Sequence, residues 1–168
     1  MSSQPENNFI KSIHRLLPAT LYREKMHNMY RGGTPDVWYS GEQDLWVEYK
    51  NIKALPARRV INPCDSNEFL SVLQQNWLRE RHGEGRRVAV IIGCPGGGVI
   101  LPGLKWETPL PAHEFIQQIQ DKKTIAGWIV SHTTGEKHVH SIQQTDLCRS
   151  RKTSTRDRRT SDVCQLDG

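Results

Sequence analysis

The chain has 168 residues, a net charge of +5 and 36% hydrophobic residues, which suits one domain that buries its own core. No apolar run approaches the ~20 residues of a membrane span, and residues 1–6 lack the basic and apolar segments of a secretory signal. We therefore expect a cytoplasmic protein with no membrane partner. The cysteines include no C-x-x-C pair, so we expect reduced thiols and neither a disulfide framework nor a zinc ribbon.

Residues 6–17 predict an amphipathic helix, because large apolar residues recur at helical spacing and Pro18 follows them. Glu6 lies in the first turn, on the side of this apolar stripe. There it either offsets the helix dipole or carries an acidic group toward carboxylates further along the chain. Residues 21–30 show no clear period, and we interpret them as an extended segment that forms the first strand.

The stretch Gly33–Asp36 and the stretch Glu48–Lys50 enclose two short apolar runs around a glycine-containing loop. This pattern predicts a β-hairpin. The proline before Asp36 disfavours helix at the preceding residue, so Asp36 begins the extended run. Because side chains alternate along a strand, Glu48 and Lys50 point to one face of the hairpin and their neighbours point to the other.

With Asp36 on that face as well, two carboxylates and one ammonium group converge. Carboxylates brought together repel each other unless a cation lies between them. Mg²⁺ suits such a place, because it binds through one or two carboxylates together with waters and substrate phosphate. Charged residues also occur on the strands of any soluble protein, so ordinary surface charge remains an alternative interpretation of Asp36, Glu48 and Lys50.

Basic residues follow the hairpin. Residues 51–65 predict a loop with turn residues and positive charge, including Lys53, Arg58 and Arg59. Their charges suit a DNA backbone beside the acidic cluster, and they suit a solvated loop equally well. Arg79, in the next expected helix, is a fourth candidate DNA contact.

A second helix is predicted over 67–81, with Asp65 or Ser66 as its N-cap and Glu68 helping to complete a capping box. Gln74 lies within the apolar stripe of this helix. A buried amide without hydrogen-bond partners costs about 1–3 kcal/mol, so Gln74 either bonds to backbone groups or faces the carboxylate cluster.

Residues 87–93 predict a fully buried strand, because the run is continuously apolar and rich in β-branched residues. Residues 99–101 predict the return strand. The glycine-rich turn between them, residues 94–98, matches neither phosphate-loop signature, and we interpret it as a flexible turn. Helix, hairpin, helix and buried strand in this order predict an α/β domain with a mixed sheet.

Residues 111–122 predict a short helix with Phe115, Ile116 and Ile119 directed inward, and residues 127–130 predict a strand.

His138 and His140 would share one face of a strand and could bind a metal ion, although the sequence offers no third ligand. From residue 145 the chain becomes polar and charged, which predicts a disordered basic tail over 145–168 that adds sequence-independent affinity for phosphates. We assign the folded domain to residues 1–144.

The stretch Gly33–Asp36 followed by Glu48–Lys50 resembles the PD-(D/E)xK nuclease signature. The glutamine-bearing segment 71–74, the turn after its helix and the strand at 88–92 look similar to the virus-type replication-repair nuclease (VRR-NUC) branch of that superfamily. The resemblance covers about residues 6–101. It implies a restriction-endonuclease-like core, α-β-β-β-α-β, with helices flanking a mixed central sheet.

The resemblance also implies roles for individual residues. Asp36 and Glu48 match the metal-binding carboxylates, and Lys50 matches the lysine that positions or activates the attacking water. Glu6 matches a helix-borne acid that assists the metal site. Gln74 matches the glutamine that supports the site from the second helix. The gap between Asp36 and Glu48 is long enough to require a well-formed hairpin loop.

The implied activity is that of a metal-dependent DNA endonuclease, a hydrolase that cleaves phosphodiester bonds. Mg²⁺ would be the metal, Mn²⁺ is expected to substitute for it, and Tyr49 would add its backbone carbonyl as a ligand. The substrate would be branched or junction DNA cut by a homodimer, or duplex DNA cut in a restriction-like or nicking mode. A small nuclease of this branch suggests phage or prophage origin, action in a bacterial host cytoplasm and a part in DNA repair.

Two other classes of function remain open. One is a non-catalytic nucleic-acid-binding module on the same fold. The other is a zinc-binding regulator built on His138, His140 and the cysteines.

Overall fold

A computed structural model describes residues 4–26 and 32–134. Five strands and four α-helices, with one short 3-10 helix (η1), follow one another along this part of the chain. In order they are α1 (Gln4–His14), β1 (Tyr22–Lys25), β2 (Val37–Ser40), β3 (Leu45–Asn51), α2 (Val72–Gly83), β4 (Arg87–Cys94), β5 (Gly97–Pro102), η1 (Lys105–Glu107), α3 (Ala112–Gln117) and α4 (Lys122–Thr133).

The five strands form one sheet in the order β1-β2-β3-β4-β5. Neighbouring strands are antiparallel except for β3 and β4, which run parallel because α2 crosses over between them. The sheet is therefore mixed, and the chain begins with the order α-β-β-β-α-β. Both features confirm the α/β core predicted from the sequence.

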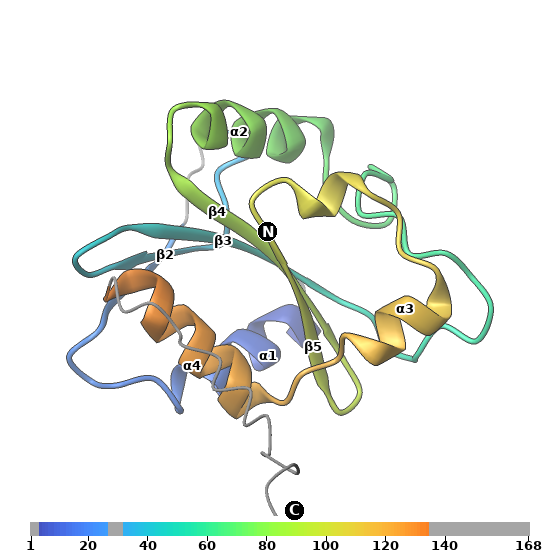
Figure 1. Cartoon of the computed structure of the whole chain (residues 1–168), viewed down its shortest axis with the longest axis horizontal. Coiled ribbons are helices and arrows are strands. Elements are labelled where there is room, and N and C mark those ends of the chain that lie inside the picture. Colours follow the sequence, from blue (N-terminus) through green and yellow to red (C-terminus); the bar gives the residue numbers. More distant parts are fainter. Residues whose placement is uncertain (1–3, 27–31, 135–168) are drawn as a thin grey trace, which may run out of the picture. The chain divides into compact units, whose positions relative to one another are not determined.

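Helices cover both faces of this sheet (Figure 1). One core lies between the sheet and the helices α1 and α4, and includes Ile13, Tyr49 and Ile129. The other lies on the side of α2 and α3, and includes Leu78, Val90 and Phe115. Strand β4 contributes to both cores, which explains why its sequence is continuously apolar.

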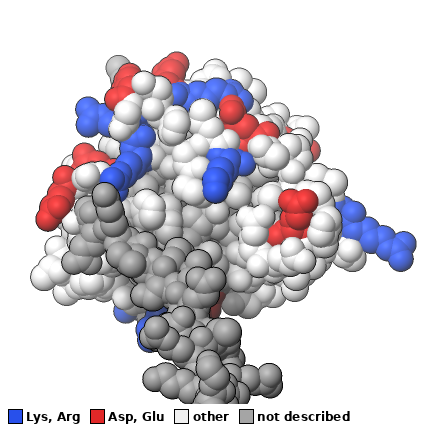
Figure 2. All heavy atoms as spheres, viewed as in Figure 1, with Lys and Arg blue, Asp and Glu red and all other residues white. Residues whose placement is uncertain are grey.

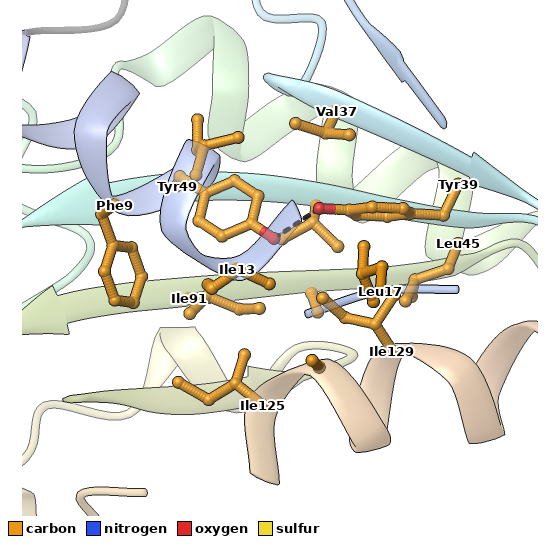
Figure 3. Packing of buried hydrophobic residues seen from close by; sticks show 14 of the residues in the cluster. Phe9, Ile13, Leu17, Val37, Tyr39, Leu45, Tyr49, Ile91, Ile125 and Ile129 are labelled. Atoms are coloured by element: carbon orange, nitrogen blue, oxygen red, sulfur yellow. Dashed lines mark hydrogen bonds between the residues drawn. The ribbon is translucent and has the colours of Figure 1, made fainter. Parts of the chain in front are cut away.

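Strand β3 shows the alternation expected from its sequence. Val47 and Tyr49 are buried in the core on the α1 and α4 side, and Figure 3 shows Tyr49 within this core. The residues between and beyond them, Trp46, Glu48 and Lys50, point to the α2 side. The chemistry-bearing residues of β3 therefore face the helix that carries Gln74.

The predicted start of the second helix is wrong. Helix α2 begins at Val72 rather than Asn67, and its N-cap is Ser71 instead of Asp65 or Ser66. The Ser71 side chain accepts a hydrogen bond from the backbone N–H of Gln74, and the Gln74 side chain accepts one from the backbone N–H of Ser71. This reciprocal capping box fixes the first turn five residues later than predicted.

The predicted strand at 127–130 is also wrong, because these residues lie within α4. Asp121 caps this helix by accepting a hydrogen bond from the backbone N–H of Thr124. Ile125 and Ile129 form a buried pair at helical spacing. A short apolar run cannot be assigned to strand or helix from its periodicity, and here the capped helix is formed.

The helix predicted over 111–122 is present but shorter, as α3. Phe115 is fully buried as expected, whereas Ile116 is 44% exposed and does not point inward. Among the helices described, none has the length and apolar character needed to cross a membrane.

Two of the cysteines, Cys64 and Cys94, are free thiols. Several predictions fall outside the described residues: those for His138 and His140, the basic tail over 145–168, and the last part of the extended segment proposed at 21–30.

Candidate active site

The Asp36 carboxylate is held against strand β3. Pairing between β2 and β3 stops at Val37, opposite Val47. Two residues further along β3, the backbone N–H of Tyr49 donates to Oδ2 of Asp36 at 2.9 Å instead of to a strand carbonyl. The side chain of Asp36 therefore accepts the next hydrogen bond of β3 after the backbone pairing with β2 has ended. This contact places the carboxylate beside the segment 48–50.

Glu48 is almost completely buried, with 1% of its surface exposed. Its Oε1 atom accepts hydrogen bonds from Nζ of Lys50 at 2.9 Å and from Nε2 of Gln74 at 2.5 Å. Its Oε2 atom is buried and has no hydrogen-bond partner within the described chain. A buried carboxylate oxygen without a partner is costly, so the site has an unused position for a proton or a cation.

The pKa of Glu48 also indicates an open position for a proton or a cation. Burial, followed by the charge of Asp36, raises the pKa of Glu48 to about 8, and Lys50 only partly opposes this rise. Burial by itself would lower the pKa of Lys50, but the carboxylate of Glu48 outweighs this effect and the pKa of Lys50 is raised. Lys50 is therefore charged at neutral pH, while Glu48 holds a proton unless another cation approaches it.

Gln74 connects helix α2 to both groups. Its Nε2 donates to Glu48, and its Oε1 accepts from Nζ of Lys50 at 3.4 Å as well as from the backbone N–H of Ser71. The amide thus caps the helix and orients the carboxylate. Both interpretations left open for Gln74 are therefore present, since its amide bonds to a backbone group and also contacts the carboxylate cluster.

Glu6 lies on the first turn of α1, the helix whose apolar residues Phe9, Ile10 and Ile13 pack into the core on the α1 and α4 side. Its charge still reaches the site, where it contributes to the raised pKa values of Glu48 and Lys50. Within residues 4–26 and 32–134, however, no three carboxylate, imidazole or thiol groups gather closely enough to hold a metal ion. The expected cluster of three acids is therefore not assembled.

The remaining donors fit one hard cation. Mg²⁺ commonly takes one or two protein carboxylates and completes its shell with waters and phosphate oxygens. Glu48 offers the buried Oε2 atom, and Asp36 lies beside it. The N–H and C=O groups of one strand residue point to the same side, so the Tyr49 carbonyl points toward Asp36, past the end of the β2–β3 ladder.

A buried hydrogen-bond chain lies behind the site. The Tyr49 and Tyr39 hydroxyls are 2.7 Å apart, and Nε2 of His14 lies 2.9 Å from the Tyr39 hydroxyl; Figure 3 shows the two tyrosines meeting within the core. Burial, with the charges of Arg23 and Lys25, lowers the pKa of His14 to about 4. Sequence reasoning missed this chain, although His14 shares a helix face with apolar Ile10 and Ile13 of α1.

The predicted DNA-contacting cations separate into two places. Lys53, Arg58 and Arg59 line a hollow of about 680 Å³ formed by residues 51–59 with Glu68 and Phe69, which we call the loop pocket. Arg79 lies elsewhere, on α2, where it pairs with Glu107 and stacks over Trp106. On the face drawn in Figure 2, basic and acidic side chains are interspersed rather than gathered into one basic patch.

Comparison with known proteins adds little to what the structure of the chain shows. No family model matches the chain, and no curated protein matches it. One solved structure that the chain resembles is Hjc, a Holliday junction resolvase from the archaeal hyperthermophile Archaeoglobus fulgidus. The two are 15% identical with a TM-score of 0.46, over 76% of this chain and 99% of Hjc. The residues of the site are therefore the guide to what this chain does.

Proposed function

We propose that this chain is a Mg²⁺-dependent DNA phosphodiesterase that cuts within DNA strands. The observation that carries the proposal is the setting of Glu48, whose buried Oε2 atom has no partner in the described chain while Asp36 and charged Lys50 lie beside it. A structural ion pair has no need of a second carboxylate next to the first. A site for a divalent cation and a phosphate does.

Each side chain has a distinct task in this proposal. Asp36 and Glu48 would hold Mg²⁺, with the Tyr49 carbonyl as a third oxygen. When bound, the ion stabilises the negative charge that develops on the phosphoryl oxygens. Gln74 keeps the Glu48 carboxylate oriented through its short hydrogen bond.

Lys50 is the residue closest to the nucleophile in this scheme. Its charged Nζ would orient a water molecule for in-line attack and favour loss of the water's proton. The phosphorus–oxygen bond to the leaving strand would break as the new bond to the water oxygen forms; the water's proton would pass to solvent, and the leaving oxygen would take up a proton from solvent. Because these groups act on one reacting centre, the effects of removing them should not add.

The wider context stays within the same proposal. DNA is the expected polymer, with the loop cations as backbone contacts, and the cytoplasm is the expected compartment. A junction-cutting enzyme would work as a two-fold dimer, because it must cut two strands symmetrically. A restriction-like or nicking enzyme would act on continuous duplex.

The test is cleavage of supercoiled plasmid and of flapped, four-way and linear DNA, with and without Mg²⁺ and Mn²⁺. We expect the wild-type chain to cut only with metal. We expect Asp36→Asn and Lys50→Ala to lower the rate by about 100-fold or more. Arg86→Ala, an exposed cation at the opposite end of β4, is the matched control and should cut normally.

Folding of each variant is checked by its circular dichroism spectrum and melting temperature. Metal-dependent cutting at the wild-type rate by both Asp36→Asn and Lys50→Ala would refute the proposal. DNA binding without any cleavage by the wild-type chain would instead favour the non-catalytic module.

A further inference from the structure

The loop pocket lies between the two segments that carry the candidate active site. Its first lining residue, Asn51, follows Lys50 at the end of β3, and its last, Phe69, comes two residues before the α2 cap Ser71. Consecutive Cα atoms are about 3.8 Å apart, so the pocket opens within a few residues of Lys50 and Gln74. Figure 1 shows this connection as the loop that runs out from β3 and returns to α2.

The charges in the pocket suit an anion. Three cations and one carboxylate line it, and the carboxylate, Glu68, pairs with Arg59 at 2.8 Å. Lys53 and Arg58 make no ion pair or hydrogen bond with any other residue that the structure describes. Two unneutralised cations beside a phosphate-cleaving site favour a phosphate group as their ligand.

The rest of the pocket is apolar. Ile52 and Phe69 are nearly buried and form part of its wall. Leu55 is 43% exposed, and it lies between Ala54 and Pro56 in the segment that also carries the two cations. An exposed leucine next to two free cations gives the pocket one surface for an apolar group and another for an anion, and a nucleotide has both.

We propose that the loop pocket holds one unpaired nucleotide of the substrate strand, next to the phosphate that is cut. This inference rests on the proposed nuclease function for its location. A continuous duplex offers a protein its phosphates, its sugars and the base edges in its grooves, but it keeps the faces of its bases stacked inside, so it does not fill an apolar hollow with a base. An unstacked nucleotide fills one, and unstacking costs least where the strand is already unpaired.

The substrate class follows from this occupant. DNA with unpaired nucleotides beside the scissile bond, such as a flap or a frayed branch, would be preferred over continuous duplex. The preference would come from Leu55 and its apolar neighbours, whereas Arg58 and Lys53 would strengthen binding through the adjoining phosphate.

The experiment measures binding by fluorescence anisotropy without divalent metal, so that cleavage plays no part. The probes are a labelled duplex and the same duplex carrying a three-nucleotide flap. Leu55→Ser and Arg58→Ala alter the pocket. Val60→Ser is the control for Leu55→Ser, because Val60 is an exposed apolar residue, at 54%, outside the lining. Arg86→Ala is the control for Arg58→Ala.

We expect the wild-type chain to bind the flapped DNA at least about 5-fold more tightly than the duplex, equivalent to ~1 kcal/mol. Leu55→Ser should bring this ratio close to one and leave duplex binding nearly unchanged. Arg58→Ala should weaken binding of the flapped DNA more than binding of the duplex. Both controls should behave as the wild-type chain does.

Equal affinity of the wild-type chain for the two probes would overturn the pocket assignment, as would a flap preference that survives both pocket variants. These results are independent of the cleavage assay. A flap preference in a chain that never cuts would contradict the nuclease proposal and support the pocket assignment. Cleavage without a flap preference would support the nuclease proposal and contradict the pocket assignment.

Discussion

At the scale of single residues, Glu48 is the least favourable group in the candidate site. Its carboxylate is buried, lies beside Asp36 and leaves Oε2 without a partner in the described chain. In water such a group would ionise near its ordinary pKa of 4.5, yet here the pKa is raised to about 8. The fold therefore keeps an unfavourable carboxylate whose charge is best compensated by a ligand, which is typical of functional sites.

This raised pKa predicts a pH dependence of stability. Between the unfolded value of 4.5 and the folded value of about 8, the folded chain binds a proton on Glu48 that the unfolded chain has released. Stability from this group is therefore complete below pH 4.5 and is lost as the pH rises toward 8. His14, with its pKa lowered from 6.5 to about 4, acts in the opposite sense, but only below pH 6.5.

The window from pH 6.5 to 8 thus isolates Glu48. In EDTA, we expect the free energy of unfolding of the wild-type chain to fall by about 1–2 kcal/mol across it. Urea denaturation at both pH values measures this. Glu48→Gln should abolish the decline, and Mg²⁺ should reduce it by binding the charged carboxylate. A decline of the same size in Glu48→Gln would show that another group is responsible.

At the scale of elements, the site depends on how closely the loop before β2 approaches α2. Gly33 has a φ of +94°, and a Cβ atom placed on it would lie 2.5 Å from the Leu73 carbonyl oxygen. Leu73 lies in the first turn of α2, next to Gln74. The glycine therefore sets the distance between the segment that carries Asp36 and the helix that orients Glu48.

Gly33→Ala should lower the stability of the chain by more than the backbone strain alone accounts for, because the new Cβ atom would also clash with Leu73. Gly85 provides the matched control, because its φ is +81° and nothing lies within 4 Å of a Cβ placed there. Gly85→Ala should cost about 1–2 kcal/mol, the cost of a left-handed non-glycine residue. Gly33→Ala should cost about 1–3 kcal/mol more, from overpacking, and should also slow cleavage. Urea denaturation measures the loss of stability, and the plasmid assay measures the rate of cleavage. Equal losses of stability in the two variants would show that the close contact between Gly33 and Leu73 adds no cost.

The same elements show what the sequence could predict. The hairpin was predicted from two apolar runs around a glycine-containing loop. The position of Glu48 and Lys50 on one face of it was predicted from the alternation of side chains along a strand, which is a local rule. The start of α2 did not, because two plausible caps precede the real one at Ser71. The helix at 122–133 was missed because its short apolar run fits a strand as well as a helix.

At the scale of the whole molecule, the contacts that the sequence could not predict are those between distant segments. His14, Tyr39 and Tyr49 come from α1, β2 and β3, and they meet in the folded chain although they lie far apart in the sequence. The loop pocket likewise joins residues 51–59 to Glu68 and Phe69 across a turn whose shape no local rule predicts. The motif indicated Asp36, Glu48 and Lys50 because its spacing is local to one hairpin.

The segment 145–168, predicted to be a basic tail, should strengthen DNA binding through its positive charges. It carries six arginine or lysine residues: Arg149, Arg151, Lys152, Arg156, Arg158 and Arg159. Each phosphate contact made by such a cation releases counterions and steepens the salt dependence of DNA binding. A chain ending at Gln144 should therefore keep its melting temperature but bind DNA less tightly, with a smaller slope of log K against log salt.

A full-length variant with glutamine at these six positions should match the truncated chain, because charge rather than length carries the effect. Anisotropy titrations between about 50 and 200 mM salt measure both slopes. Slopes equal to that of the wild-type chain would mean that the tail does not contact the phosphates, and that the loop cations provide the electrostatic part of binding.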